Sequence, residues 1–108
     1  MREPRITTAQ AETLALNAKR IGVDNAPTIC ALAAEAVEAE ALAGFYAERA
    51  ERAYHLSEAI FAGGGGLDEF SDIEDRLRTV TDEAYRLRDK ALIRLEIHAE
   101  RAGILDPS

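Results

Sequence analysis

The feature that most constrains this chain is an apolar seam in its C-terminal third. Apolar residues recur there at intervals of three and four positions: Ile73, Leu77, Val80, Ala84, Leu87, Ala91 and Leu95. Those intervals place every member on one side of an α-helix. A stripe of this length needs another long helix to cover it. The seam therefore predicts a helical hairpin whose apolar residues form a core or a dimer interface.

A second long helix is predicted from Ala26 to about Phe61. Asp24 or Asn25 can cap its start, and Pro27 suits a first turn because the missing amide would have no partner there anyway. Gly44 lies in the middle of this segment, where glycine costs about 1 kcal/mol relative to alanine. It predicts a kink or a close approach of a neighbouring helix, and the surrounding alanines favour the close approach.

A short first helix is predicted to begin near Thr7 and to stop at Gly22. Thr7 and Gln10 have the spacing of a capping box, and glycine is the preferred residue in the left-handed position after a helix. Residues 1–6 before it are expected to form a loose arm.

The long helices are predicted to be joined by a glycine-rich connector over residues 63–70. Ser71 and Glu74 then form a second possible capping box, so we expect the last helix to begin at Ser71. It should end near Arg101 or Ala102, before Gly103. With no alternating β-branched run anywhere, the predicted fold is a single all-α domain over residues 1–108: a long antiparallel hairpin with a short N-terminal helix.

Composition predicts self-association and limits the possible ligands. Alanine supplies much of the 47% hydrophobic content, and aromatic residues make up only 6%. A core built this way is thin, which favours a homodimer that completes a helical bundle. The net charge of −7 argues against binding to a nucleic-acid backbone or to an anionic membrane surface. The N-terminal residues lack a signal peptide or an apolar span, and the expected location is the cytoplasm.

The largest local charge imbalance lies in the second predicted helix. No basic residue occurs between Arg20 and Arg49, whereas this region contains four glutamates: Glu35, Glu38, Glu40 and Glu48. These residues are either a solvated surface or an acidic face for a basic protein partner. Small acidic helical proteins of phages and mobile elements often inhibit nucleic-acid-handling machines in this way, and this class is the analogy that the face suggests.

Two pairs of acids allow a different interpretation. Glu35-x-x-Glu38 and Glu69-x-x-Asp72 resemble the E-x-x-E and E-x-x-D signature of MazG-like nucleotide pyrophosphohydrolases. The resemblance covers only these four residues, and it implies an all-α enzyme whose acids hold Mg²⁺ against a nucleoside triphosphate. The second pair departs from the family pattern, because it lies at a predicted loop–helix junction rather than inside a helix.

From the sequence we therefore expect a non-enzymatic interaction module that presents an acidic helix face to a basic partner, with no catalytic residue, metal or cofactor. Two alternatives stay open. One is the Mg²⁺-dependent pyrophosphohydrolase, and the other is a structural assembly subunit.

Overall fold

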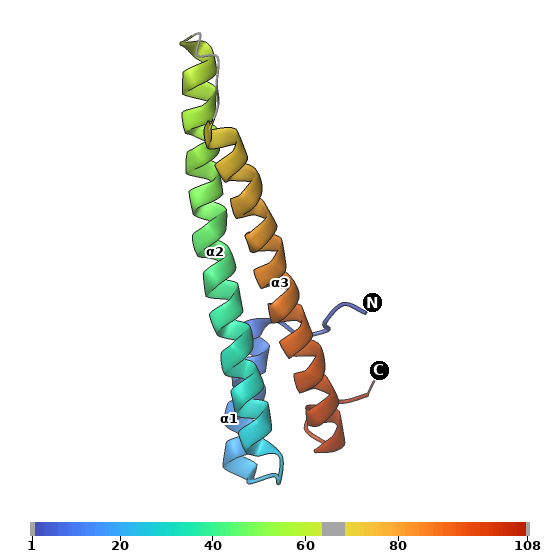
Figure 1. Cartoon of the computed structure of the whole chain (residues 1–108). Coiled ribbons are helices and arrows are strands. Elements are labelled where there is room, and N and C mark those ends of the chain that lie inside the picture. Colours follow the sequence, from blue (N-terminus) through green and yellow to red (C-terminus); the bar gives the residue numbers. More distant parts are fainter. Residues whose placement is uncertain (1, 64–68, 108) are drawn as a thin grey trace. The chain divides into compact units, whose positions relative to one another are not determined.

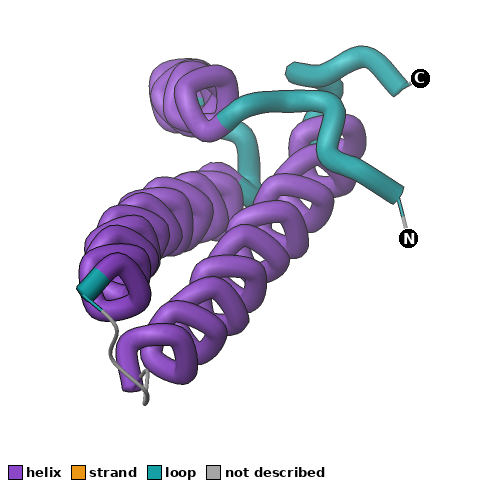
Figure 2. Tube along the Cα trace, turned by 90° about the horizontal axis from the view of Figure 1, so that it is seen from above, coloured by secondary structure: helices purple, strands orange, loops and turns teal. Residues whose placement is uncertain are grey.

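The computed structural model describes residues 2–63 and 69–107, and its regular elements are three helices. They are α1 (Thr8–Ile21), α2 (Ala26–Ala62) and α3 (Glu69–Arg101). Long α2 and α3 pack as an antiparallel hairpin, and α1 is the short N-terminal helix (Figure 1). The described residues are otherwise loop (Figure 2). The predicted all-α hairpin is confirmed.

The two ends of α1 follow the predicted capping chemistry. The Thr7 hydroxyl accepts a hydrogen bond from the backbone N–H of Gln10 at 3.2 Å, and the Gln10 side chain accepts one from the N–H of Thr7 at 2.8 Å. This reciprocal pair satisfies two amides that have no partner inside the helix. Gly22 follows the helix at φ 81°, and its N–H donates to the Ala18 carbonyl at 2.9 Å.

Helix α2 begins within one residue of the predicted cap and continues as α-helix through Gly44. Gly44 is exposed, and a Cβ built on it would meet nothing within 4 Å. The expected close approach of a neighbouring helix at Gly44 is therefore wrong. Of the nearest alanines that suggested it, Ala43 is buried, whereas Ala41 is exposed.

The start of α3 differs from the sequence prediction, whereas its end agrees. The helix already contains Glu69 and Phe70, so Ser71 is its third residue and cannot be the N-cap. The predicted connector overlaps this start, and residues 64–68 of it lie outside the described part of the chain. At the other end, Gly103 has φ 75°, and the N–H of Ile104 donates to the Ala99 carbonyl at 3.0 Å. This is the expected glycine stop.

The chain divides into two compact units, to which both long helices contribute. The first unit comprises residues 1–40 and 86–108, and its core combines α1, the start of α2 and the end of α3. Among the described residues, the largest fully buried side chains are Ile29, Leu92, Leu95 and Glu96, all in this unit. Ile6 is also buried there, so the segment expected to be a loose arm contributes to the core.

The second unit comprises residues 41–85. Among its described residues, the buried side chains are small: Ala43, Ala50, Ala53, Ser57, Thr81 and Ala84. The large apolar side chains of this unit are half-buried or exposed instead. Alanine removes little apolar area from water, so this part of the hairpin gains less hydrophobic stabilisation per residue than the first unit.

The predicted seam on α3 is buried only in part. Leu95 is fully buried, as are the two alanines of the seam, whereas Leu77 and Val80 are half-buried. Ile73 is 44% exposed and Leu87 is 61% exposed. Thr81 and Arg88 each follow a seam residue by one position and are less exposed than the residue before them. The side of α3 that faces the chain's own core is therefore rotated away from the apolar stripe at these turns.

Candidate functional site

Two of the four predicted acidic residues are freely presented. Glu35 and Glu38 are exposed on α2, within the first unit. Glu48, in the second unit, is exposed too, and its carboxylate lies 3.6 Å from the Arg52 guanidinium in an i,i+4 pair. Such an exposed pair contributes at most about 1 kcal/mol and leaves both groups accessible.

The remaining predicted residue, Glu40, is held by contacts within the first unit. Its carboxylate accepts a hydrogen bond from the Thr8 hydroxyl at 2.9 Å and one from Arg88 at 3.1 Å. Burial lowers the pKa of Arg88, but hydrogen bonds and opposite charge from Asp89 and Glu40 outweigh it, so the pKa is raised overall. Glu40 therefore serves to join α1, α2 and α3 rather than to attract a partner.

These polar groups line a cavity of about 350 Å³ beside the N-terminal segment. Its wall includes Glu40, Asp89 and the half-buried Arg88, together with apolar atoms of Ile6 and Leu92. The acids already neutralise the guanidinium, so the cavity offers no unpaired cation to an anionic ligand. We assign this cluster a structural role.

The second polar cluster of the first unit is built on Glu96, a fully buried carboxylate. One oxygen accepts hydrogen bonds from the guanidinium groups of Arg2 and Arg5, at 3.1 and 3.3 Å, and the other accepts the backbone N–H of Arg5 at 2.8 Å. These charge-assisted bonds compensate for the cost of removing the carboxylate from water. They hold the N-terminal segment against α3. No local sequence pattern predicts this long-range contact.

An exposed stripe runs along the part of α2 that belongs to the second unit, and we call it the outer stripe. Its members recur at intervals of three and four positions, and each is exposed: Leu42, Phe45, Arg49, Arg52, Leu56 and Ala59. Helical periodicity therefore places them on one side of α2. Leu56, near the end of this stripe, is 49% exposed.

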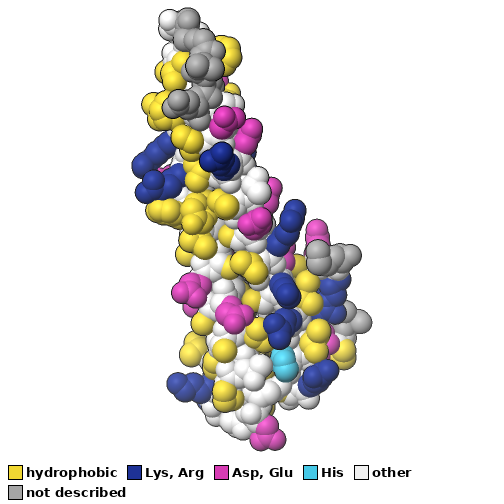
Figure 3. Space-filling view, in the orientation of Figure 1, with side chains coloured by type: hydrophobic (Ala, Val, Ile, Leu, Met, Phe, Trp, Pro, Cys, Tyr) yellow, Lys and Arg dark blue, Asp and Glu magenta, His cyan; other side chains and the backbone are white. Residues whose placement is uncertain are grey.

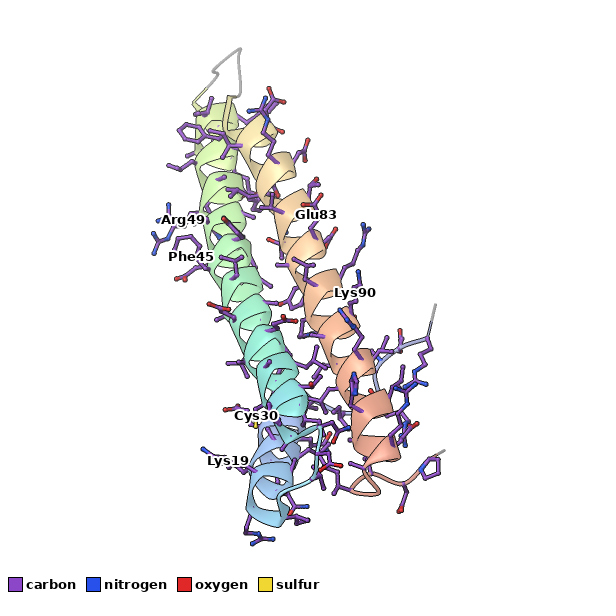
Figure 4. All side chains as sticks on the ribbon, turned by 60° about the horizontal axis from the view of Figure 1, so that its bottom comes forward. Lys19, Cys30, Phe45, Arg49, Glu83 and Lys90 are labelled. Atoms are coloured by element: carbon purple, nitrogen blue, oxygen red, sulfur yellow. The ribbon has the colours of Figure 1, made fainter. Side chains whose placement is uncertain are left out.

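The first two residues of the outer stripe are apolar, and one of them is aromatic. Leu42 is 46% exposed and Phe45 is 48% exposed, and hydrophobic side chains gather over this part of α2 with cationic side chains beside them (Figure 3). The Arg49 guanidinium lies 4.5 Å from the centre of the Phe45 ring, which is a cation–π contact. Both side chains project from α2 on the side away from α3 (Figure 4). Aromatic residues combined with arginine are typical of protein–protein contact surfaces.

Other titratable groups on this part of α2 form ordinary surface pairs. The hydrogen bond and the negative charge of Glu58 raise the pKa of Tyr54. His55 lies 3.8 Å from the carboxylate of Glu51, one helical turn earlier, and both side chains are exposed. Nothing in these pairs points to a nucleophile or a general base.

The four acids of the pyrophosphohydrolase resemblance are divided between the units. Glu35 and Glu38 belong to the first unit, and Asp72, which is exposed, belongs to the second, whereas the side chain of Glu69 lies outside the described residues. Among the residues that the structure describes, no group of three or more His, Cys, Asp or Glu side chains could hold a metal ion. The Mg²⁺ site remains an untested prediction.

Comparisons with known proteins add no family to this picture: no family model, no curated protein and no solved structure matches the chain. Within the described residues, no helix is both long enough and apolar enough to cross a membrane.

Proposed function

We propose that this protein is a non-enzymatic interaction module that binds a protein partner through the outer stripe of α2. The observation that carries the proposal is the exposure of Leu42, Phe45 and Leu56 on one side of a single helix. Leu42 and Phe45 lie one helical turn apart, and Leu56 lies on the same side beyond two arginines. Exposed apolar side chains grouped in this way mark contact surfaces. This is also the helix-face geometry by which proteins commonly bind one another.

The acidic residues keep a role in the proposal, although a smaller one than the sequence predicted. Glu35 and Glu38 are exposed on the part of α2 that belongs to the first unit, while Glu40 is engaged within the chain. A partner with basic residues beside an apolar strip would complement this arrangement. Opposite charges at the edge of an interface increase the association rate and set the register more than they increase affinity.

The test is capture of protein partners by the immobilised chain, compared between variants. The double variant Leu42→Ser with Phe45→Ser should lose any partner that the wild type captures, and Glu35→Gln with Glu38→Gln should weaken capture at low salt. The matched control is Glu51→Gln with Glu58→Gln, which removes two exposed acids from another side of the same helix. Because all six positions are exposed, the fold should be unaffected.

Two results would overturn the proposal. One is equal capture by the Leu42/Phe45 variant and the wild type. The other is Mg²⁺-dependent hydrolysis of nucleoside triphosphates that is lost in the Glu35/Glu38 variant, which would favour the pyrophosphohydrolase.

A further inference from the structure

We infer that a second copy of this chain docks on the first unit, with α2 of each copy packed along α3 of the other. Every residue behind this inference belongs to residues 1–40 and 86–108. The inference rests on the proposed function in one respect, the role of Glu35 and Glu38 as contacts for a basic partner, and it is independent of the outer stripe. The observation that carries it is a match between two unpaired charged stripes, one on α2 and one on α3.

The basic stripe lies on the part of α3 that belongs to the first unit. Its members recur at intervals of three and four positions, and each is exposed: Arg86, Lys90, Arg94, Ile97 and Arg101. The acids of the same part of α3 lie outside the stripe and are already paired: Asp89 with Arg88, Glu96 with Arg2 and Arg5, and Glu100 with Arg5. Within the described part of the chain, the four cations of the stripe form no ion pair. This side of α3 is therefore a local excess of positive charge in a chain whose net charge is −7.

The acidic stripe lies on the part of α2 that belongs to the first unit. Its members have the same helical spacing, and each is exposed: Thr28, Ala31, Glu35 and Glu38. Among the described residues, neither glutamate of this stripe has an ion-pair partner. The other two members are small, so a second helix can approach α2 here.

Both stripes are open to a second chain, because α1 lies on the other side of the first unit. In the view of Figure 1, α1 lies behind α2, which it contacts through the Cys30 thiol and the Ala15 carbonyl at 3.6 Å. In the same view, the front of the first unit carries acidic side chains over α2 and basic side chains over α3 (Figure 3). One face of the unit thus presents both charges side by side.

The register of the chain's own hairpin matches the two stripes. The Glu40 carboxylate lies 3.1 Å from the Arg88 guanidinium, so these two residues lie at about the same height along the antiparallel helices. Glu38 is two residues from Glu40, and Lys90 is two residues from Arg88 in the opposite direction along the chain. Counting onward in this way gives three exposed pairs at matching heights: Glu38 with Lys90, Glu35 with Arg94, and Ala31 with Ile97.

A two-fold axis parallel to the helices keeps each residue at its height and places α2 of one copy over α3 of the other. Glu38 then faces Lys90 of the second copy, and Glu35 faces Arg94 of the second copy. Ile97, which is 37% exposed, meets a small residue of the acidic stripe. Each contact occurs twice, so the face is self-complementary, as a two-fold interface requires.

The same charges disfavour other occupants of this face. A two-fold axis across the helices would place α2 on α2 and α3 on α3, so that acids face acids and cations face cations, which is unfavourable. A nucleic-acid backbone or an anionic lipid surface would be attracted by the basic stripe but repelled by the acidic stripe beside it. A second copy satisfies both stripes at once.

Charge reversal tests the inference through the molar mass in solution. The acid variant carries Glu35→Lys and Glu38→Lys, and the basic variant carries Lys90→Glu and Arg94→Glu. Sedimentation equilibrium should show a dimer of the wild type at micromolar concentration, and association should weaken by about tenfold or more in each variant alone, because like charges then meet. A mixture of the two variants should associate again. So should a single chain with all four changes, whose net charge stays at −7.

The matched control is Glu3→Lys with Glu12→Lys, which reverses two exposed acids of the first unit outside both stripes and should leave the dimer intact. Circular dichroism checks that each variant keeps the helical fold. Three results would overturn the inference: a monomeric wild type, a dimer insensitive to both reversals, or a four-change chain that stays monomeric. Binding of a short DNA duplex by a monomeric wild type would assign the basic stripe to a polyanion instead.

The inference and the proposed function can fail separately. A monomeric wild type that captures another protein through Leu42 and Phe45 would retain the proposed function and reject the second copy. A dimer that responds to the charge reversals as expected, but captures no protein through Leu42 and Phe45, would retain the inference and reject the outer stripe as a contact surface.

The arrangement of the helices is tested by cross-linking single cysteines in a Cys30→Ala background. Ala31→Cys and Ile97→Cys both change exposed positions that face each other across the inferred interface. When the two variants are mixed, a short thiol-specific cross-linker should join them to each other faster than it joins either variant to itself. Faster joining of Ala31→Cys to itself would show that α2 faces α2 and would contradict the inference.

Discussion

The two units of this chain use their apolar residues in opposite ways. The first unit buries large side chains such as Ile29, Leu92 and Leu95, and three helices contribute to its core. The second unit buries alanines with Ser57 and Thr81, and among its described residues the large apolar side chains Leu42, Phe45, Leu56 and Phe61 are exposed. Both units belong to the same pair of long helices, so the difference lies in which residues face inward.

This contrast separates stability from recognition. Hydrophobic stabilisation scales with the apolar area removed from water, so the first unit should provide most of the stability of the isolated chain. In the second unit, small inward residues let the two helices pack, while the larger residues remain available for another surface. We therefore expect mutations of buried residues in the first unit to act on folding and mutations on the outer stripe to act on binding.

The largest expected effect comes from two leucines of the same predicted seam. Leu95→Ala removes a fully buried side chain from the first unit and should lower the free energy of unfolding by about 2–5 kcal/mol. Leu87→Ala alters a side chain that is 61% exposed and should change the free energy of unfolding by about 0.5 kcal/mol or less. Urea denaturation of both variants measures the difference.

Equal losses at the two leucines would break the comparison. They would mean that Leu87 is covered in solution, and the seam rather than the outer stripe would then be the place to look for a partner. The sequence predicted that the seam forms either a core or a dimer surface. The two variants test these two roles separately.

The sequence predicted the fold well because its signals are local. Capping at Thr7, the glycine stops at Gly22 and Gly103, and the three-four periodicity of the long helices depend on neighbours a few residues away. The same signals left open which residues of a wide apolar stripe would face inward. That choice depends on packing between elements, and so Leu87 and Leu56 could not be placed from periodicity alone.

The candidate site was less predictable for the same reason. The acidic stretch was visible in the sequence, but Arg88 is 48 residues away from Glu40, and only the folded chain brings the two together. The arm at residues 2–6 is held by Glu96 over still longer separations of 94 and 91 residues. By contrast, the outer stripe is a local pattern on one helix, and it could have been found by searching α2 for a second periodic face that combines apolar, aromatic and arginine residues.

A smaller effect is expected from the buried carboxylate that anchors the N-terminal segment. Glu96→Gln removes the charge that accepts bonds from Arg2 and Arg5, and it should lower the free energy of unfolding by about 1–3 kcal/mol. Amide hydrogen exchange at Arg5 and Ile6 should also become faster, since the backbone N–H of Arg5 donates to the same carboxylate. The control is Glu100→Gln, which loses only a more exposed pair with Arg5. If residues 2–6 stay equally protected in both variants, the segment is held by the burial of Ile6 rather than by Glu96.

The smallest expected effects have opposite signs at two glycines, one in each unit. Gly44 lies in an exposed helical position of the second unit with open space around its Cα, so Gly44→Ala should raise the free energy of unfolding by up to about 1 kcal/mol. Gly22 in the first unit has φ 81°, a conformation that costs an L-residue about 1–2 kcal/mol, so Gly22→Ala should lower it. Thermal unfolding of the two single variants at equal concentration gives the sign of each change in the free energy of unfolding.

A loss of stability in Gly44→Ala at high protein concentration, absent on dilution, would show that a second chain approaches α2 closely at Gly44. The docked helix would then lie on a different side of α2 from the outer stripe, because the position of Gly44 in the helical repeat places it away from Leu42 and Phe45.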